Sequence, residues 1–438
     1  MLVSTTSPQA ATAARNYAIV TAAYWGFTLT DGALRMLVLL HFYRLGYSSL
    51  TLAFLFLLYE AAGIVANLVG GWLATHFGIP RMLMAGLVTQ IAGFLMMSAL
   101  MPEWSAAASV AWVIAAQGIC GVAKDLTKTA SKSAIKLTAG DASGKLFQWV
   151  AWFTGSKNAM KGFGFFLGGV LLEFLGFRGA LWAMAAALGF VLIGVLLSLP
   201  PKLGKAQASR SAREFFAKGR GINLLAAARV FLFGARDVWF VVGLPIFLYS
   251  AGWTFTMVGS FLAVWTIGYG IVQAAAPALV RRGGHDHEAG ISAARWWSFL
   301  LTLVPVLMVA WLLIGQYKVN LAADWPAPFG EWLSWGLQHP DGPIVVGLVL
   351  FGIAFAVNSS VHSYLVLAYA GTEKAAEDVG FYYAANAAGR FMGTLLSGLL
   401  YGWGGLAACL GGSAIMLTTC WLIALALPPL GVGIRSTK

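Results

Sequence analysis

The sequence predicts an all-α integral membrane protein with twelve transmembrane helices, arranged as two pseudo-symmetric six-helix halves around a central cavity. Of the 438 residues, 59% are hydrophobic and only 10% are charged, which leaves too little polar surface for a water-soluble fold. Apolar stretches long enough to cross a hydrocarbon core of about 30 Å recur along the whole chain. All three cysteines fall inside these stretches, so the pattern predicts neither a disulfide framework nor a metal site.

The predicted spans follow one another at short intervals. We place them at 17–43, 48–74, 81–101, 106–135, 146–174, 178–199, 222–250, 254–280, 290–315, 343–369, 380–401 and 405–427. The first is not a secretory signal peptide, because it lacks a small-residue cleavage site and carries Asp31 and Arg35 in its body.

The distribution of Lys and Arg predicts that both termini are cytoplasmic. In this orientation sixteen of these residues lie in cytoplasmic segments and three in the outer loops, as the positive-inside rule requires. The net charge of +12 is thus divided between cytoplasmic loops and buried helices, and it does not indicate a nucleic-acid partner.

The polar segment 201–221 divides the chain into an N-terminal half, 1–200, and a C-terminal half, 222–438. The segment carries six Lys or Arg and a single acid, which is typical of a cytoplasmic linker. The two halves also echo each other: residues 63–65 and 270–272 both read Gly-Ile-Val, in the second and eighth spans. A 6+6 layout with internal similarity predicts an ancient duplication.

The segment after the second span, GGWLATHFGIPR, resembles the loop between the second and third helices of the major facilitator superfamily. Gly71, Gly78 and Arg81 match that pattern, whereas Thr75 and His76 stand where the family has an acid and a base. The resemblance implies the major facilitator fold and a cytoplasmic gating loop, and the two departures from the pattern imply a charge contact that is weaker or lies elsewhere. A plain tight turn is the alternative interpretation.

Charged residues inside the spans are mostly positive, with eight cations at depth against four acids. A charge in the membrane core costs roughly 2.5–3.5 kcal/mol on insertion scales, so such residues usually face a cavity and mark a transport path. The surplus predicts an anionic substrate. The expected substrate-binding residues are Arg35, Lys124, Lys128, Lys157, Asn158, Lys161, Arg236 and Arg390. For Arg229 two roles stay open, lining of the cavity and packing between helices. The acids, which are candidates for proton coupling or internal ion pairs, are Asp31, Glu60, Asp125 and Asp237.

The spacing of the charged residues predicts which of them share a helix face. The lysines at 124, 128, 132 and 136 recur every four residues and form a slowly winding stripe, of which Lys132 and Lys136 are expected to reach the cytoplasmic interface. Asp31 and Arg35 are spaced to meet on one helix face.

Arg236 and Asp237 are adjacent, so we expect their side chains to point apart and the guanidinium to face a ligand. Guanidinium groups bind phosphate-like oxyanions with two parallel hydrogen bonds. An arginine on the first span and one on the seventh resemble the arrangement in organophosphate transporters of the superfamily, which implies a phosphate-type substrate.

Several strings resemble the ArsJ-type organoarsenical efflux permeases, and they cover the membrane region at 28–40, 63–73, 121–136, 154–169, 228–248 and 267–277. The resemblance implies a monomeric, cofactor-free transporter of the bacterial inner membrane that exports 1-arseno-3-phosphoglycerate and so confers arsenate resistance. It also implies functional coupling to a glyceraldehyde-3-phosphate dehydrogenase, which makes this compound from arsenate.

Two other functions stay open. One is an organophosphate or phosphate exchanger of the same superfamily, and the other is a non-transporting membrane receptor or assembly protein. The sequence has no HExxH or GxSxG motif, so an enzyme is not expected.

Overall fold

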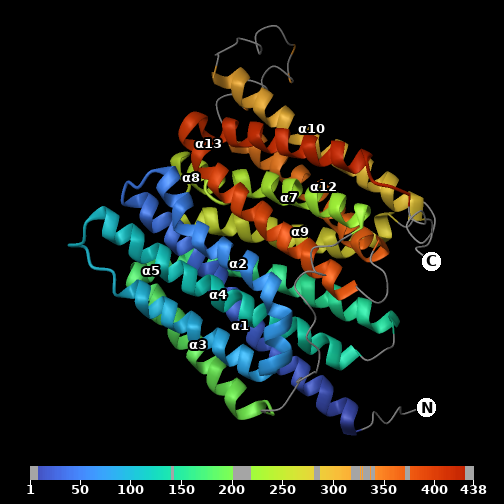
Figure 1. Ribbon diagram of the computed structural model, residues 1–438. Helices are drawn as coiled ribbons and strands as arrows, with labels where there is room; N and C mark the ends of the chain where they lie inside the picture. Colours follow the sequence, from blue (N-terminus) through green and yellow to red (C-terminus); the bar gives the residue numbers. More distant parts are fainter. Residues whose placement is uncertain are drawn as a thin grey trace. The chain divides into compact units, whose positions relative to one another are not determined.

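The computed structural model describes residues 8–139, 143–200, 219–280, 287–316, 341–369 and 375–429, and the single positions 326, 328 and 336. The described residues are almost entirely helical and contain no strand, which confirms the predicted all-α fold. The helices are α1 (Pro8–Arg44), α2 (Ser49–Phe77), α3 (Ile79–Ser98), α4 (Ala106–Ala139), α5 (Ser143–Ser198), α7 (Arg220–Phe240), α8 (Gly243–Ser250), α9 (Phe255–Val280), α10 (His287–Gln316), α12 (Asp341–Tyr369) and α13 (Ala375–Leu425) (Figure 1).

Two of these helices each contain two predicted spans, joined at a glycine corner instead of a loop. The corner of α5 is at Gly176 (φ 67°, ψ −177°), and that of α13 is at Gly404 and Gly405, the latter with φ 60° and ψ −150°. Such positive-φ, extended-ψ conformations are essentially restricted to glycine. By length and composition, eight described helical stretches can cross a membrane, and two of them, of 44 and 45 residues, run through these corners.

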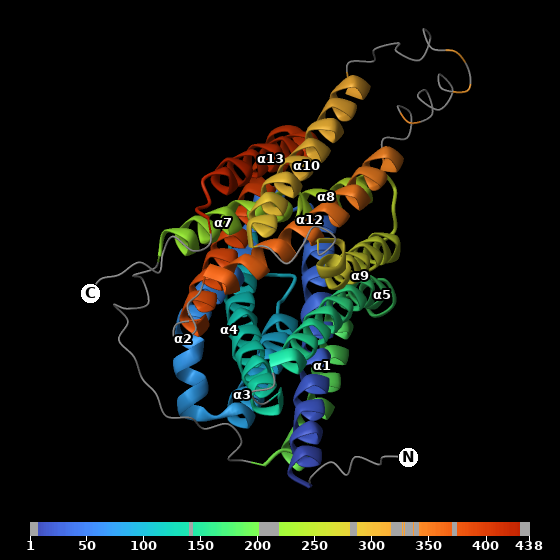
Figure 2. The same cartoon turned by 90° about the vertical axis from the view of Figure 1, so that its right-hand side faces the viewer.

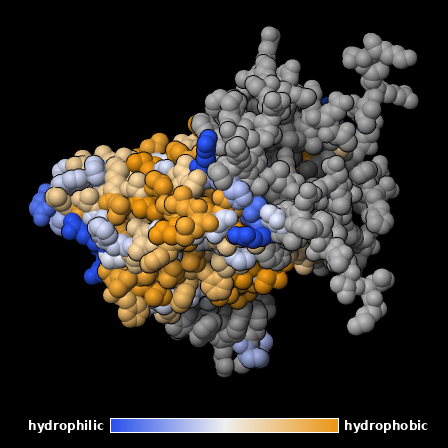
Figure 3. Space-filling view, turned by 90° about the horizontal axis from the view of Figure 1, so that it is seen from below, coloured by the Kyte–Doolittle hydropathy of each residue, from blue (hydrophilic) through white to orange (hydrophobic). Residues whose placement is uncertain are grey.

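The described surface is strongly apolar, as contact with lipid requires. On α5, Phe174 and Phe190 are each 76% exposed and Leu197 is 82% exposed. Apolar residues also dominate the described part of the face shown in Figure 3. Soluble monomers rarely expose apolar patches of this extent, so these side chains are suited to a bilayer.

The chain forms two compact units. Unit 1 consists of Met1–Phe42, Leu55–Glu214 and Phe255–Gly270, and unit 2 consists of Tyr43–Phe54, Phe215–Thr254 and Ile271–Lys438. Residues 43–54, from the N-terminal half of the sequence, therefore belong to unit 2, and residues 255–270, from the C-terminal half, belong to unit 1. The predicted linker lies largely outside the described residues, so the predicted division at 201–221 stays a prediction.

In unit 1, α3 packs against α4 (Figure 2) and also against α5. Glycines bring other backbones of this unit close together. A β-carbon at Gly121 of α4 would lie 2.7 Å from the Tyr59 carbonyl oxygen of α2, and one at Gly32 of α1 would lie 2.8 Å from the Lys161 carbonyl oxygen of α5. Bare backbone at such contacts is typical of membrane helix packing. The charged residues of α1, α2, α4 and α5 therefore lie on closely packed helices.

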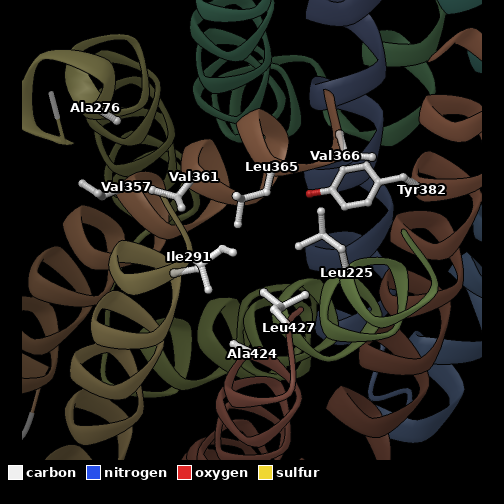
Figure 4. Packing of buried hydrophobic residues seen from close by; sticks show 11 residues of the cluster. Leu225, Ala276, Ile291, Val357, Val361, Leu365, Val366, Tyr382, Ala424 and Leu427 are labelled. Atoms are coloured by element: carbon white, nitrogen blue, oxygen red, sulfur yellow. The ribbon is translucent and has the colours of Figure 1, made fainter. Parts of the chain in front are cut away.

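In unit 2, α7 runs along α13, and α10 packs against α12 and α13. A β-carbon at Gly393 of α13 would lie 2.6 Å from the Gly234 carbonyl oxygen of α7, so the two helices approach without intervening side chains. An apolar cluster that includes Leu225, Ile291 and Tyr382 holds α7, α10, α12 and α13 together (Figure 4).

Candidate substrate-binding site

A carboxylate bridges two cations in unit 1. Glu60 of α2, which is 1% exposed, accepts a hydrogen bond from Nη2 of Arg35 of α1. The other oxygen of Glu60, Oε2, lies 3.9 Å from Nζ of Lys124 of α4. One buried acid thus holds predicted substrate-binding residues from two different helices.

Tyr59, the neighbour of Glu60, adds two further contacts. Its hydroxyl donates to both oxygens of Asp31, at 2.6 and 2.8 Å. Nζ of Lys124 lies 3.8 Å from the centre of its ring, and Cζ of Arg35 lies 5.6 Å from it, both within the range of cation–π attraction. The partner of Arg35 is therefore Glu60 rather than Asp31. Sequence reasoning missed Tyr59, although a tyrosine next to an acid in an apolar span was a visible signal.

The third acid of unit 1, Asp125, is 2% exposed and pairs through Oδ1 with Nζ of Lys128, at 3.3 Å. Its Oδ2 is buried and has no hydrogen-bond partner among the described residues. The side chains of Lys132 and Lys136, which were expected to reach the cytoplasmic interface, lie outside the described residues. The α1–α2–α4 cluster thus combines three cations with three acids and is balanced in charge.

Helix α5 supplies the positive surplus of unit 1. Lys157, Asn158 and Lys161 are all partly buried, and Nζ of Lys161 lies 5.5 Å from the centre of the Phe165 ring. With these two lysines, the predicted charges at depth in unit 1 are five cations and three acids. The surplus is two positive charges.

Asp237 is the buried acid of unit 2, and it lies between two arginines. Its Oδ1 accepts from Nε of Arg236 at 2.7 Å, and its Oδ2 accepts from Nε of Arg390, on α13, at 3.1 Å. The expectation that Arg236 and Asp237 point apart is therefore wrong. Adjacent Cβ atoms do diverge on a helix, but the long arginine side chain folds back far enough to reach the carboxylate.

Arg229 is buried among neutral groups. It is 4% exposed, donates from Nε to Oδ1 of Asn386 at 3.1 Å, and donates from Nη1 to the carbonyl oxygen and Oγ of Ser359 at 3.2 and 3.1 Å. No acid pairs with it in the part of the chain that the structure describes. Of the charges that the sequence places at depth, unit 2 thus contains three arginines and one acid, Asp237, again a surplus of two.

Phe233 lies between two of these arginines. Cζ of Arg229 lies 4.0 Å and Cζ of Arg236 lies 4.9 Å from the centre of its ring. The three residues follow at intervals of four and three on α7, which places them on one helix face. This spacing was the available sequence signal, and Phe233 was not among the predicted site residues.

The predicted gating residues are described only in part. Gly78 has φ 77° and begins the turn into α3, so this position requires glycine, and Arg81 is exposed. Gly71 lies within α2, but its surroundings fall outside the described residues. Their role in gating stays a prediction.

The described residues contain no cluster of His, Cys, Asp or Glu that could hold a metal ion. Cys120, Cys409 and Cys420 are buried and unbridged. The geometry found in both units is instead a set of cations held by buried acids or neutral groups, which suits the binding of anions.

Comparison with known proteins agrees with this architecture. Solved structures with similar folds include the nucleoside transporter NupG (15% identity, TM-score 0.65, covering 93% of this chain and 98% of that one) and a POT family transporter in complex with 5-aminolevulinic acid (13%, 0.69, 94% and 95%). Another is a bacterial homologue of the iron transporter ferroportin in an inward-facing state (14%, 0.64, 96% and 99%). At these identities the similarity shows the fold alone.

A search of curated proteins gives no match. The family model described as Major Facilitator Superfamily matches residues 17–329, which is more than half of the chain. The chain is therefore a multi-pass membrane transporter that belongs to the Major Facilitator Superfamily.

Proposed function

We propose that this transporter exports 1-arseno-3-phosphoglycerate across the bacterial inner membrane and so confers arsenate resistance. The observation that carries the proposal is the positive surplus in each unit: two charges in unit 1, supplied by the α5 lysines, and two in unit 2, supplied by its arginines. The resemblance to ArsJ-type permeases supplies the name of the compound and the direction of transport.

The proposed substrate matches this distribution of charge. It carries an arsenate ester and a phosphate ester on a three-carbon skeleton, and a phosphate monoester carries about −1.5 to −2 charges at pH 7. A surplus of two, as counted in either unit, therefore matches the charge of one such oxyanion group. The compound would come from a glyceraldehyde-3-phosphate dehydrogenase that accepts arsenate in place of phosphate.

In such a transporter, the bridging acids hold the cations in place when no substrate is bound. Without substrate, Glu60 and Asp237 neutralise part of the charge on their cation pairs. An incoming dianion competes with each carboxylate for the same cations, so binding loosens contacts between α1, α2 and α4 and between α7 and α13. Alternating access needs a differential interaction of this kind, because a ligand shifts a conformational equilibrium only through unequal affinities.

Resistance to arsenate in growing cells tests the proposal. A strain without its own arsenic exporters would produce the dehydrogenase together with the wild-type chain or with Lys157→Ala, Arg236→Ala or Arg178→Ala. Arg178 is an exposed arginine that bonds to the carbonyl oxygen of Leu100, so it serves as the matched control. We expect resistance with the wild type and the control only. Full resistance in the other two variants, at equal amounts of protein in the membrane, would contradict the proposal.

The second candidate, an organophosphate or phosphate exchanger, is favoured by the arginine pair around Asp237, which suits any phosphate-type anion. Everted vesicles distinguish the two functions. Uptake of the dehydrogenase product supports export, whereas uptake of glycerol 3-phosphate without uptake of the arsenoester supports the exchanger. Running both assays with and without a proton gradient also tests whether any of the buried acids couples transport to protons.

A further inference from the structure

Arg229 adds to the positive surplus of unit 2 but is not among the residues proposed to contact the substrate, and its surroundings are unusual. A guanidinium that is 4% exposed normally has an acid beside it, because burying an unpaired charge is costly. Here the partners of Arg229 among the described residues are the neutral side chains of Asn386 and Ser359 and a backbone carbonyl, and these groups do not cancel its charge. These hydrogen bonds occupy Nε and Nη1.

The charge of Arg229 lies close to the exposed part of the anion site of unit 2. Cζ of Arg229 lies 4.0 Å and Cζ of Arg236 lies 4.9 Å from the centre of the same Phe233 ring. The two Cζ atoms are therefore no more than 8.9 Å apart. The side chains of Arg236 and Arg390 are 14% and 17% exposed, so a ligand can reach them more easily than it can reach Arg229.

We propose that Arg229 is a positioning residue that acts on the bound anion through its electric field, from behind Phe233, and makes unit 2 select doubly charged over singly charged oxyanions. This inference rests on the proposed function, because it assumes an oxyanion bound at Arg236 and Arg390. It assigns to Arg229 a share of the discrimination between charge states, in addition to the share of the arginines in contact with the ligand.

Coulomb's law sets the expected size of the effect. An anion in contact with Arg236 lies at most about 13 Å from Arg229, and at an effective dielectric constant of about 20 each unit of negative charge then gains at least roughly 1.3 kcal/mol, which is about a tenfold change in Kd. Removing the charge of Arg229 should therefore weaken binding of a monoanion about tenfold and of a dianion about 100-fold. A packing role for Arg229 predicts the same loss for both ligands.

Two glycerol esters of equal shape provide the test. Glycerol 3-phosphate is close to a dianion at pH 8, and glycerol 3-sulfate is a monoanion. Titration calorimetry on the purified full-length protein would give Kd for each ester with the wild type and with Arg229→Gln. Arg295→Gln is the matched control, because Arg295 also bonds to neutral acceptors, the carbonyl oxygens of residues 424, 425 and 427. We expect the preference for the phosphate ester to fall about tenfold in Arg229→Gln and to stay unchanged in the control.

Two further variants keep the inference testable if Arg229→Gln does not fold. Asn386→Ala removes a hydrogen bond from Arg229 but leaves its charge, and Arg229→Lys keeps the charge without the planar group. Both should retain the preference for the phosphate ester. Loss of the preference in either variant, or an equal loss for both esters in Arg229→Gln, would overturn the inference.

The same experiments separate this inference from the proposed function. A wild-type protein that transports the arsenoester but binds neither glycerol ester would overturn the role of Arg229 and leave the transport function standing. A wild-type protein that neither transports the arsenoester nor binds the esters would overturn both.

Discussion

Replacing Asp237 with Asn removes the acid between Arg236 and Arg390 while keeping its shape. The distance of 3.1 Å between Oδ2 and Nε of Arg390 corresponds to an attraction of roughly 5 kcal/mol at an effective dielectric constant of about 20. Removal of one partner from a buried ion pair usually costs about 3–5 kcal/mol, because the other charge remains buried. We therefore expect the free energy of unfolding to fall by about 3–5 kcal/mol in the absence of an anion.

An anion should reverse this loss. Glycerol 3-phosphate competes with the carboxylate in the wild type but meets no competitor in Asp237→Asn, so it should raise the melting temperature of the variant by more than that of the wild type. Thermal unfolding of the purified protein, followed by the fluorescence of its 18 tryptophans, measures both effects.

Asp341→Asn is the matched control for this experiment. Asp341 also belongs to unit 2, but its Oδ2 accepts a hydrogen bond from the neutral Nε1 of Trp253, at 3.2 Å. We expect a smaller loss of stability and no added response to the anion. The reasoning is refuted if Asp237→Asn is as stable as the wild type, or if glycerol 3-phosphate stabilises the wild type more than the variant.

Three other changes test unit 1. Glu60→Gln removes the acid that competes for Arg35 and Lys124, so vesicle transport should show a lower KM together with a lower kcat; a higher KM would argue against competition. Tyr59→Phe keeps the ring in contact with Lys124 but removes the hydroxyl that donates to the Asp31 carboxylate. A hydrogen bond to a charged group is worth about 1.5–3 kcal/mol, so the melting temperature should fall. An unchanged value would mean that the hydroxyl contributes nothing. Gly121→Ala should also lower the melting temperature, because its β-carbon would lie 2.7 Å from a backbone oxygen of α2. Gly189→Ala is the control and should leave the melting temperature unchanged, because its β-carbon would have no atom within 4 Å. Equal effects of the two changes would exclude helix contact as the cause.

Hydropathy was sufficient to predict where most of the described helices lie, but the seventh predicted span, 222–250, is divided into α7 and α8 at Val241 and Val242. The third predicted span, 81–101, corresponds to a helix at Ile79–Ser98, and the predicted breaks near 175–177 and 402–404 fall at the glycine corners. The sequence did not reveal that these breaks contain no loop. A hydropathy profile records how apolar a segment is, and it does not report the backbone angles at a single glycine.

The site was predictable as a set of charges but not as a set of partners. Long side chains can reach acids on other helices, as Arg35 reaches Glu60, or on the next residue, as Arg236 reaches Asp237. Helical spacing alone does not distinguish these options. Aromatic residues such as Tyr59 and Phe233 were missed because an apolar span offers many rings, and only packing shows which of them lie against a cation.

The glycine corners also bear on how the chain enters the membrane. From Phe391 to Leu425 the sequence has no charged residue, and the corner of α13 lies within this stretch. The insertion machinery therefore meets no polar loop and no flanking Lys or Arg at which one span could be stopped and the next started. We therefore expect these two spans to enter the lipid together, with an orientation that is set by charges outside them.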